Sequence, residues 1–365
     1  MLFNINDIKW CNFLNIKQVY GDFPVNFLDT IPQYDNPAFK KHDKYHFVYD
    51  KLFITQSQDL PSGKLEDFNL NKPDIDYPIF IKPRWGHTSA GSKDCYKIKD
   101  KKQLSTFIKK PNMMWSTFID ANEGMTDFVM QNGKILYQLT YEYSPQQNVF
   151  ADDWKYISPQ STPPPKIVDW VHKHLPDYTG ALNVQYRDDI IIEVSLRFAR
   201  RGSYLKSTGN TNLIHNINNV IGNPIHQQWN YEVNTSFRPY YSFKCWCPFT
   251  LLYILPNKIM EFIIDITGSK PFFEYYFEPT GKNGTIFFQF QHHNFKAGMK
   301  IKKWIEGLFI LCNFFFIITL FVCIFAIHQP KTNKLGYHML GLLLVLYLTL
   351  FLNSYYHFSK IFRIV

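Results

Sequence analysis

The chain has 365 residues, a formal net charge of +9 at pH 7 and an aromatic content of 18%. Its length suffices for one large or two ordinary domains with a buried core. Its lysines are scattered and its six cysteines have the spacing of neither a zinc site nor a disulfide framework, so we expect no nucleic-acid partner and a reduced compartment.

The first 45 residues predict no regular element, because Pro24, Pro32 and Pro37 interrupt them. The opening residues also lack the continuous apolar core of a signal peptide. Strand and helix patterns alternate from there onward. The expected elements are a helix over 51–60, strands over 77–82 and near 95–98, a helix over 99–108 and a strand over 113–119.

A β-hairpin is predicted next, with strands Met125–Met130 and Lys134–Tyr143 joined by a turn that contains Asn132 and Gly133, a strong turn signal. Prolines at 163–165 then open a helix that continues through His174, since proline suits the first helical turn. Two further strands follow within 180–198. Helices alternating with strands and antiparallel hairpins predict an α+β fold for residues 46–222.

The last part of the chain predicts an α/β extension over 223–304 and then a membrane hairpin within 305–365. Residues 307–327 form an uncharged run, and 335–352 form a second apolar run. About 20 apolar residues span a bilayer as a helix, so we predict two spans, with a buried helical hairpin in a soluble domain as the alternative. More lysines and arginines flank the pair than lie in its loop, which predicts a multi-pass membrane protein with the preceding domain on the cytoplasmic side.

Polar residues follow one face of the strand at 190–198. Alternation predicts one apolar face, made of Ile190, Ile192, Val194, Leu196 and Phe198. The other face carries Glu193, Ser195 and Arg197. An odd-length loop over 188–190 would put Gln185 of the preceding strand opposite Glu193, whereas a two-residue loop would put them on opposite faces. The polar pattern favours the odd-length loop.

This polar face has a plausible chemistry. Glutamate and glutamine oxygens suit Mg²⁺, which keeps waters and takes substrate phosphates as further ligands. Arg197 would neutralise charge on a phosphoryl group or an acyl-phosphate. Upstream, an apolar strand ends at Lys82 and leads into a loop with Gly86 and Gly91, which can fold over phosphates. The alternative is a polar sheet face with a solvent-exposed Glu–Arg pair.

The order of these pieces, from about residue 51 to 222, resembles the ATP-grasp family, and in detail the ATP-grasp domains of carbamoyl phosphate synthetase. FIKPRWGHTSAGS looks like the family's strand lysine and phosphate loop. MMWSTFIDANEGMTDFVM is similar to its hinge strand and ribose-binding glutamate. GALNVQY and IIEVSLRFARRGSYLKSTG resemble its G-x-x-N-V-Q and E-x-N-x-R strands, the latter continuing into a Lys-x-Thr-Gly element.

The resemblance implies ATP and Mg²⁺, or Mn²⁺ in its place, and a carboxylate–amine ligase that phosphorylates a small-molecule carboxylate to an acyl-phosphate. The implied site residues are Arg197 as the catalytic arginine; Lys51, Lys82, Gly86, Ser89, Gly91 and Glu123 as ATP contacts; and Gln185, Glu193 and Ser195 as metal ligands.

Two positions depart from the family pattern. Ser195 stands where the family has asparagine, and Thr117 where an acidic residue is common. The alternatives are therefore a catalytically silent ATP-binding protein or a membrane scaffold with a vestigial grasp fold. The sequence assigns neither a substrate nor an oligomeric state.

Overall fold

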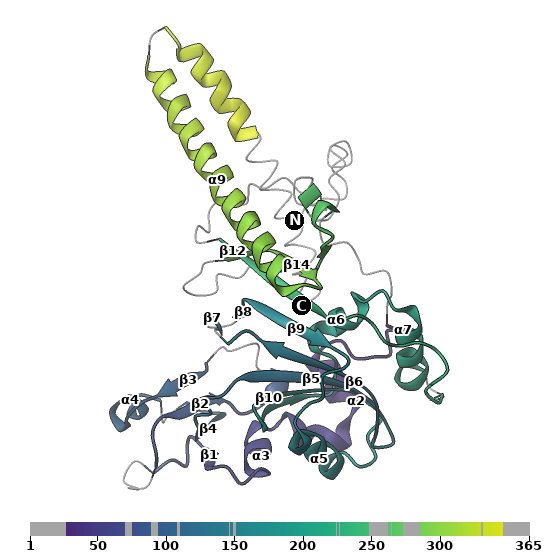
Figure 1. Cartoon of the computed structure of the whole chain (residues 1–365). Coiled ribbons are helices and arrows are strands. Elements are labelled where there is room, and N and C mark those ends of the chain that lie inside the picture. Colours follow the sequence, from purple (N-terminus) through teal and green to yellow (C-terminus); the bar gives the residue numbers. More distant parts are fainter. Residues whose placement is uncertain are drawn as a thin grey trace. The chain divides into compact units, whose positions relative to one another are not determined.

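A computed structural model describes most of the chain (Figure 1). The described residues are 27–69, 75–88, 94–107, 110–145, 147–148, 151–223, 225, 227–247, 262–263, 265–272, 285–329 and 331–345. They belong to two compact units. The main unit comprises Phe23–Pro145 and Lys155–Pro239, and the C-terminal unit comprises the chain around 151–154 and from Tyr240 onward.

The main unit contains a small antiparallel sheet with the strand order β1-β4-β2-β3. Its strands are β1 (Ser62–Lys64), β4 (Met113–Thr117), β2 (Ile79–Pro83) and β3 (Tyr96–Ile98). Ile79, Ile81 and Ile98 pack with Leu104 of helix α4 (Lys101–Ser105) in a separate small core. Strands β2, β3 and β4 and helix α4 were predicted from sequence, whereas β1 was not, and α4 is shorter than the predicted 99–108.

The same unit contains a larger antiparallel run with the strand order β11-β10-β5-β6-β9. Its strands are β11 (Ile190–Ser195), β10 (Gly180–Arg187), β5 (Glu123–Gln131), β6 (Lys134–Tyr143) and β9 (Trp154–Ser158). The predicted hairpin is confirmed, since Gln131 pairs with Lys134 and both turn residues have positive φ, the conformation that Asn-Gly favours.

One face of this larger sheet forms the main core. Phe128, Leu182 and Val184 pack there against Trp170 and Val171 of helix α5 (Pro165–His174), whose bounds match the prediction. The small core and the main core both follow from the spacing of apolar residues, which recur at every second position in the strands and at every third or fourth position in the helices. The opposite face of β10 and β5 carries polar residues such as Asp127 and Asn183 beside the apolar Met125 and Val129.

The β10–β11 hairpin contains a β-bulge. Arg187 pairs with Ile190 and Tyr186 pairs with Ile191, so a two-residue turn joins the strands. The register then shifts, which leaves Ile192 without a partner and brings Gln185 opposite Glu193. The predicted pairing of Gln185 with Glu193 is confirmed, but the predicted odd-length loop is wrong, because the extra residue lies in the strand.

The bulge also changes which isoleucine faces the core. Ile191, Val194 and Leu196 belong to the main core cluster, whereas Ile190 and Ile192 are only half-buried. The predicted apolar face was therefore wrong at 190–192 and correct at Val194 and Leu196. Strict alternation fails here because a bulge puts two residues opposite one.

Three short helices precede the small sheet, although part of this stretch was predicted to be irregular. They are α2 (Asp35–Lys41), the 3₁₀ helix η2 (Asp43–Tyr49) and α3 (Lys51–Gln56). Ala38, Val48 and Tyr49 are buried in the main core. Pro37 is compatible with α2 because it lies in the first turn, where its missing N–H is not needed.

The C-terminal unit consists of β12 (Tyr240–Cys247), β14 (Thr285–His292), β13 (Lys270–Pro271) and the long helix α9 (Phe295–His328). The beginning of α9 packs on the strands through Ile301, Ile305 and Phe309. Lys302 donates to Glu306 at 2.6 Å and to the Lys244 carbonyl at 2.6 Å. These contacts fix the first turns of α9 to the sheet.

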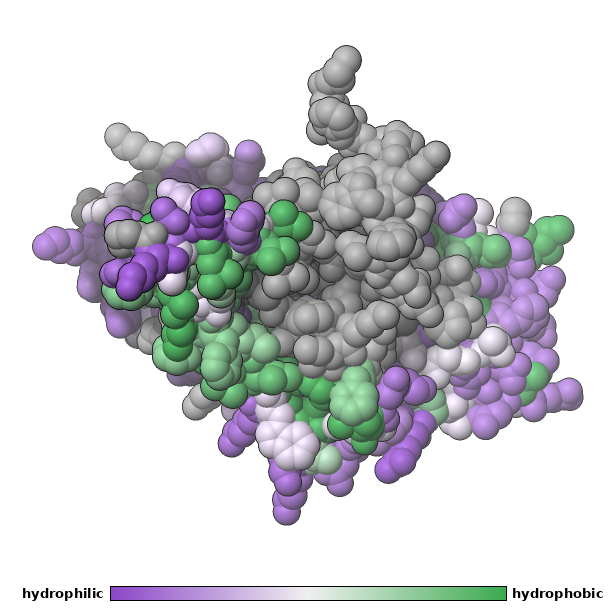
Figure 2. Space-filling view, turned by 90° about the horizontal axis from the view of Figure 1, so that it is seen from above, coloured by the Kyte–Doolittle hydropathy of each residue, from purple (hydrophilic) through white to green (hydrophobic). Residues whose placement is uncertain are grey.

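Helix α9 is the one helix among the described residues that is long and apolar enough to cross a membrane, judged by length and composition. Its outer half exposes large apolar side chains such as Phe314, Phe321 and Phe325. Hydrophobic side chains are visible at the surface in the view of Figure 2. Residues 333–345 are also helical, whereas 346–352 of the second predicted span lie outside the described residues, so a second span stays a prediction.

Candidate functional site

A row of polar side chains crosses three neighbouring strands of the main sheet. Gln185 on β10 lies opposite Glu193 on β11, and Asn183 lies opposite Ser195. Glu123 on β5 accepts hydrogen bonds from the Gln185 amide and from Arg187, the latter at 3.3 Å. The predicted metal ligands Gln185 and Glu193 and the predicted ATP contact Glu123 therefore lie together on one face.

Two buried lysines border this row. The Lys51 ammonium lies 3.4 Å from a carboxylate oxygen of Glu193, and only 5% of the Lys51 side chain is exposed. The Lys82 ammonium donates at 3.0 Å to the carbonyl of Ile192, the bulged residue. The bulge thus turns a carbonyl of the large sheet toward a lysine of the small sheet. Both predicted ATP-contacting lysines meet at Glu193.

The electrostatics of Lys82 are unusual. Burial, followed by the positive charge of Lys51, lowers the pKa of its ammonium to about 8, although the charge of Glu193 acts in the opposite direction. The neighbouring Cys95 thiol has a raised pKa, mainly through burial, although both lysines act in the opposite direction. Two ammonium groups held this close with one carboxylate leave the site short of negative charge. The site therefore favours an anion.

A further ion pair positions both lysines. Arg84, which follows β2, binds the Asp50 carboxylate through two hydrogen bonds of 2.8 and 2.5 Å. Asp50 also caps α3 by accepting from Leu52 N, and Lys51 N donates to the Arg84 carbonyl at 2.9 Å. Sequence analysis missed Asp50 and Arg84, although Asp immediately before a helical pattern is a recognised N-cap signal.

The loop after β2 is described only at its start. Gly86 opens the short 3₁₀ helix η3 (Gly86–Thr88), where it is buried and lies next to Tyr49 and the Lys51 side chain. The predicted ATP contacts Ser89 and Gly91 lie outside the described residues. The loop therefore begins beside Lys51, on the side where phosphate contacts are expected.

Arg197, the predicted catalytic arginine, pairs with a residue from the N-terminal segment. Its Nη2 donates to Asp35 Oδ2 at 2.6 Å, and its Nη1 donates to the Phe198 carbonyl at 3.1 Å. Burial alone would lower the pKa of Arg197, but the charge of Asp35 and its hydrogen bond outweigh this and raise it. About a fifth of each side chain is exposed, 22% and 20%. Sequence analysis missed Asp35, which is 162 residues away.

Asp127 on β5 is a second functional-looking residue that sequence analysis missed. Its carboxylate is buried and accepts hydrogen bonds from Tyr141 at 2.5 Å, Asn183 at 2.9 Å and Ala199 N at 2.9 Å. Burial raises its pKa to about 6, although the three hydrogen bonds act in the opposite direction. Alternation from Glu123 could have found it, since both residues share one face. Asp127 holds the start of the segment after Arg197 against the sheet.

The oxygen donors of Glu193 and Gln185 suit a hard cation such as Mg²⁺. Glu193 supplies a carboxylate and Gln185 an amide oxygen, because the Gln185 Nε2 is directed to Glu123. No cluster of three or more His, Cys, Asp or Glu side chains with metal-binding geometry occurs within the described residues. Two protein oxygens fit Mg²⁺, which completes its shell with waters and phosphates. Ser195 is buried two residues farther along β11.

Several solved structures are similar to this chain, whereas no family model and no curated protein matches it. One is an L-amino acid ligase from Bacillus licheniformis, 16% identical, with a TM-score of 0.47 and 72% of this chain and 71% of that chain covered. Another is a carboxyaminoimidazole ribonucleotide synthase from Aspergillus clavatus complexed with ATP, 11% identical, with a TM-score of 0.46 and 77% and 73% covered.

A third is the biotin carboxylase domain of Hydrogenobacter thermophilus 2-oxoglutarate carboxylase, in complex with MgADP, ADP and bicarbonate. It is 10% identical, with a TM-score of 0.44 and 71% and 67% of the two chains covered. These neighbours are an amino acid ligase, a synthase and a carboxylase domain, and all three TM-scores lie below 0.5. At such identities and TM-scores they do not specify the substrate or the site residues of this chain.

Proposed function

We propose that this chain is a membrane-anchored, ATP-dependent carboxylate–amine ligase of the ATP-grasp type. One observation carries the proposal: two buried lysines from separate segments, Lys51 and Lys82, meet the Gln185–Glu193 pair of the main sheet. Buried ammonium groups are costly to keep unless a ligand of opposite charge occupies the site. A nucleotide triphosphate supplies that charge.

Lys51 and Lys82 bind the phosphates in this proposal. Because burial depresses the pKa of Lys82, part of the Lys82 population is neutral near pH 8, and an arriving phosphate restores its charge. The start of the loop at Gly86 lies next to Lys51 and can bring backbone N–H groups toward the same phosphates. Glu123 contacts the ribose, as the resemblance implies, on the same face of the sheet.

Glu193 and Gln185 would hold Mg²⁺, or Mn²⁺ in its place, through one carboxylate and one amide oxygen. When bound, the cation neutralises phosphate charge during transfer to the substrate carboxylate. Glu193 keeps Lys51 oriented, and Glu123 fixes the direction of the Gln185 amide. Ser195 lies on the same strand and is a ligand only through its hydroxyl.

Arg197 stabilises the acyl-phosphate and the developing charge as the amine attacks. Its guanidinium has five N–H donors, of which the structure uses one for Asp35 and one for the Phe198 carbonyl. The remaining donors can reach an anion without the loss of the Asp35 pair. Asp35 thereby orients the arginine before the substrate arrives.

Membrane anchoring rests on α9. Its first turns are fixed in the C-terminal unit, and its outer half exposes apolar side chains in a run without charge. In this proposal the outer half spans the bilayer, with 335–352 as a second span and the catalytic unit on the cytoplasmic side. Partition of the full chain into the detergent phase, and not the aqueous phase, is the expected outcome of extraction.

A second candidate is a domain that binds ATP without turnover. Ser195 favours it, because a serine stands where the resemblance implies an asparagine metal ligand. Both candidates predict that MgATP raises the melting temperature of the full chain in detergent. The ligase also predicts ADP release that depends on a carboxylate and not on the corresponding amide. The absence of any ATP-dependent shift would refute both.

A further inference from the structure

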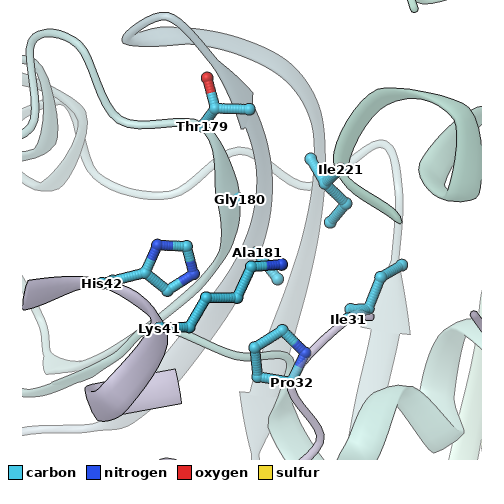
Figure 3. Close-up of a pocket in the computed structure, with 8 residues that line it drawn as sticks. All are labelled: Ile31, Pro32, Lys41, His42, Thr179, Gly180, Ala181 and Ile221. Atoms are coloured by element: carbon cyan, nitrogen blue, oxygen red, sulfur yellow. The ribbon is translucent and has the colours of Figure 1, made fainter. Parts of the chain in front are cut away.

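A small cavity lies in the main unit at the start of β10. Its volume is about 200 Å³, and its lining residues are Ile31, Pro32, Lys41, His42, Thr179, Gly180, Ala181 and Ile221 (Figure 3). Gly180 lies five residues before Gln185, which is about 17 Å along a strand at ~3.3 Å per residue. The cavity is therefore separate from the lysines and carboxylates of the candidate site.

Two nitrogen-bearing side chains from the end of α2 face this cavity. In Figure 3 the Lys41 side chain and the His42 ring extend into the same space, opposite Ile31 and Ile221. The Lys41 ammonium donates to the Thr30 carbonyl at 2.8 Å, which leaves two of its three donors for a ligand. Partial burial lowers the pKa of this ammonium.

His42 adds a neutral donor. Burial, followed by the charge of Lys41, lowers the pKa of its imidazole to about 4, so the ring is uncharged at pH 7 and one ring nitrogen carries a hydrogen. The ring packs edge-on against Tyr178 at a centroid distance of 5.2 Å, which fixes its orientation. The Thr179 hydroxyl is engaged elsewhere, because it accepts from Asn132 N at 2.9 Å.

The remaining walls are apolar, and none of the eight lining residues is acidic. Ile221 belongs to the π-helix η5 (Asn218–Gly222), a helix type that often marks functional positions. About 10–15 Å³ of this cavity volume holds one water, so the cavity has room for several waters or for a small organic anion.

We propose that this cavity binds a small monocarboxylate with a short apolar tail. The carboxylate accepts hydrogen bonds from the Lys41 ammonium and the His42 ring, and the tail packs against Ile31, Ile221 and Pro32. Inorganic phosphate fits less well, because it has no apolar part to cover the isoleucines and carries more charge than one ammonium balances. Butyrate has one carboxylate and a three-carbon apolar tail, so it serves as the test ligand.

The same short helix connects this cavity to the candidate site. Helix α2 begins at Asp35, which binds Arg197, and ends at Lys41 in the cavity wall. Seven residues correspond to about 10 Å along a helix axis, at ~1.5 Å per residue. A ligand held by Lys41 is therefore one short, rigid element away from the arginine.

The test measures sodium butyrate binding to the full chain in detergent micelles by the saturation-transfer signal of the butyrate protons. We expect Lys41→Met to weaken binding about 10-fold or more, as loss of a charge-assisted hydrogen bond does, and His42→Phe to weaken it several-fold. Lys40→Met is the matched control, because Lys40 is the adjacent exposed lysine of α2 and, unlike Lys41, does not line the cavity. It should leave affinity unchanged.

Three results would overturn the proposal. They are no butyrate signal at about 20 mM, equal affinities of the Lys40→Met and Lys41→Met proteins, and displacement of butyrate by an equal concentration of inorganic phosphate. If Lys41→Met does not fold, His42→Phe decides alone, since a phenyl ring keeps the edge contact with Tyr178 and removes the ring donor. Unchanged affinity in His42→Phe then refutes the site.

Discussion

Replacement of Lys82 by methionine should stabilise the ligand-free protein and abolish ATP binding. Burial lowers the pKa of the Lys82 ammonium from 10.5 to about 8, and one pKa unit corresponds to about 1.4 kcal/mol, so the charge costs the folded state about 3 kcal/mol below pH 8. Only 8% of the residue is exposed, so solvent screens little of this. The variant also loses the hydrogen bond to the Ile192 carbonyl, which destabilises it by about 1–2 kcal/mol.

The net gain of about 1–2 kcal/mol should raise the melting temperature by roughly 2–6 °C at pH 7, measured on the full chain in detergent. The unfolded state keeps a lysine pKa of 10.5 and the folded state loses its proton near 8, so wild-type stability rises between these pH values. The advantage of the variant should shrink over the same range. MgATP should stabilise the wild type and not the variant.

Lys99→Met is the matched control, since Lys99 is an exposed lysine close to β3 of the same sheet. It should change neither the melting temperature nor the ATP response. The reasoning is refuted if Lys82→Met is less stable than the wild type at pH 7 and still responds to MgATP, because the lysine would then be a structural donor only.

Three more perturbations probe the site. Asp35→Asn should lower the free energy of unfolding by roughly 2–3 kcal/mol, because it leaves the largely buried Arg197 with a neutral partner. It should also slow ADP release, and release at the wild-type rate would contradict an orienting role for Asp35. Deletion of Ile192 removes the bulge but leaves Gln185 opposite Glu193, and it takes away the carbonyl that accepts from Lys82. The deleted chain should therefore show a weaker MgATP response even where circular dichroism finds it folded, and an unchanged response would mean that the bulge does not position Lys82. Folded Asp127 has a pKa near 6 against 3.8 unfolded, so wild-type stability should fall by about 2 kcal/mol relative to Asp127→Asn as pH rises from 4 to 6. An equal pH dependence of the two proteins' unfolding free energies would exclude the raised pKa.

Most elements of the main unit could be predicted from local patterns. The Asn132-Gly133 turn, the proline-led helix to His174 and the pairing of Gln185 with Glu193 all follow from short-range rules. The bulge at Ile192 did not, because three consecutive isoleucines carry no signal that tells which of them lacks a partner. Sequence analysis therefore reached the correct pairing through an incorrect loop.

The parts of the site that escaped prediction depend on long-range contacts. Asp35 meets Arg197 across 162 residues, and Asn183, Tyr141 and Ala199 converge on Asp127 from three segments. Side-chain periodicity predicts a face of a sheet and does not predict which distant segment covers that face. The short N-terminal helices were missed for a similar reason, since tertiary packing stabilises helices too short to form alone.

The continuity of α9 has a mechanical consequence. The helix contains no proline, the usual cause of a sharp kink, and its first turns are fixed to β12 and β14 by Ile301, Ile305 and Lys302. A bilayer thicker or thinner than the apolar run makes a helix tilt. If α9 spans a bilayer as proposed, such a tilt would be transmitted to the strands that its first turns contact, so lipid thickness would act on the C-terminal unit and should be controlled in reconstituted preparations.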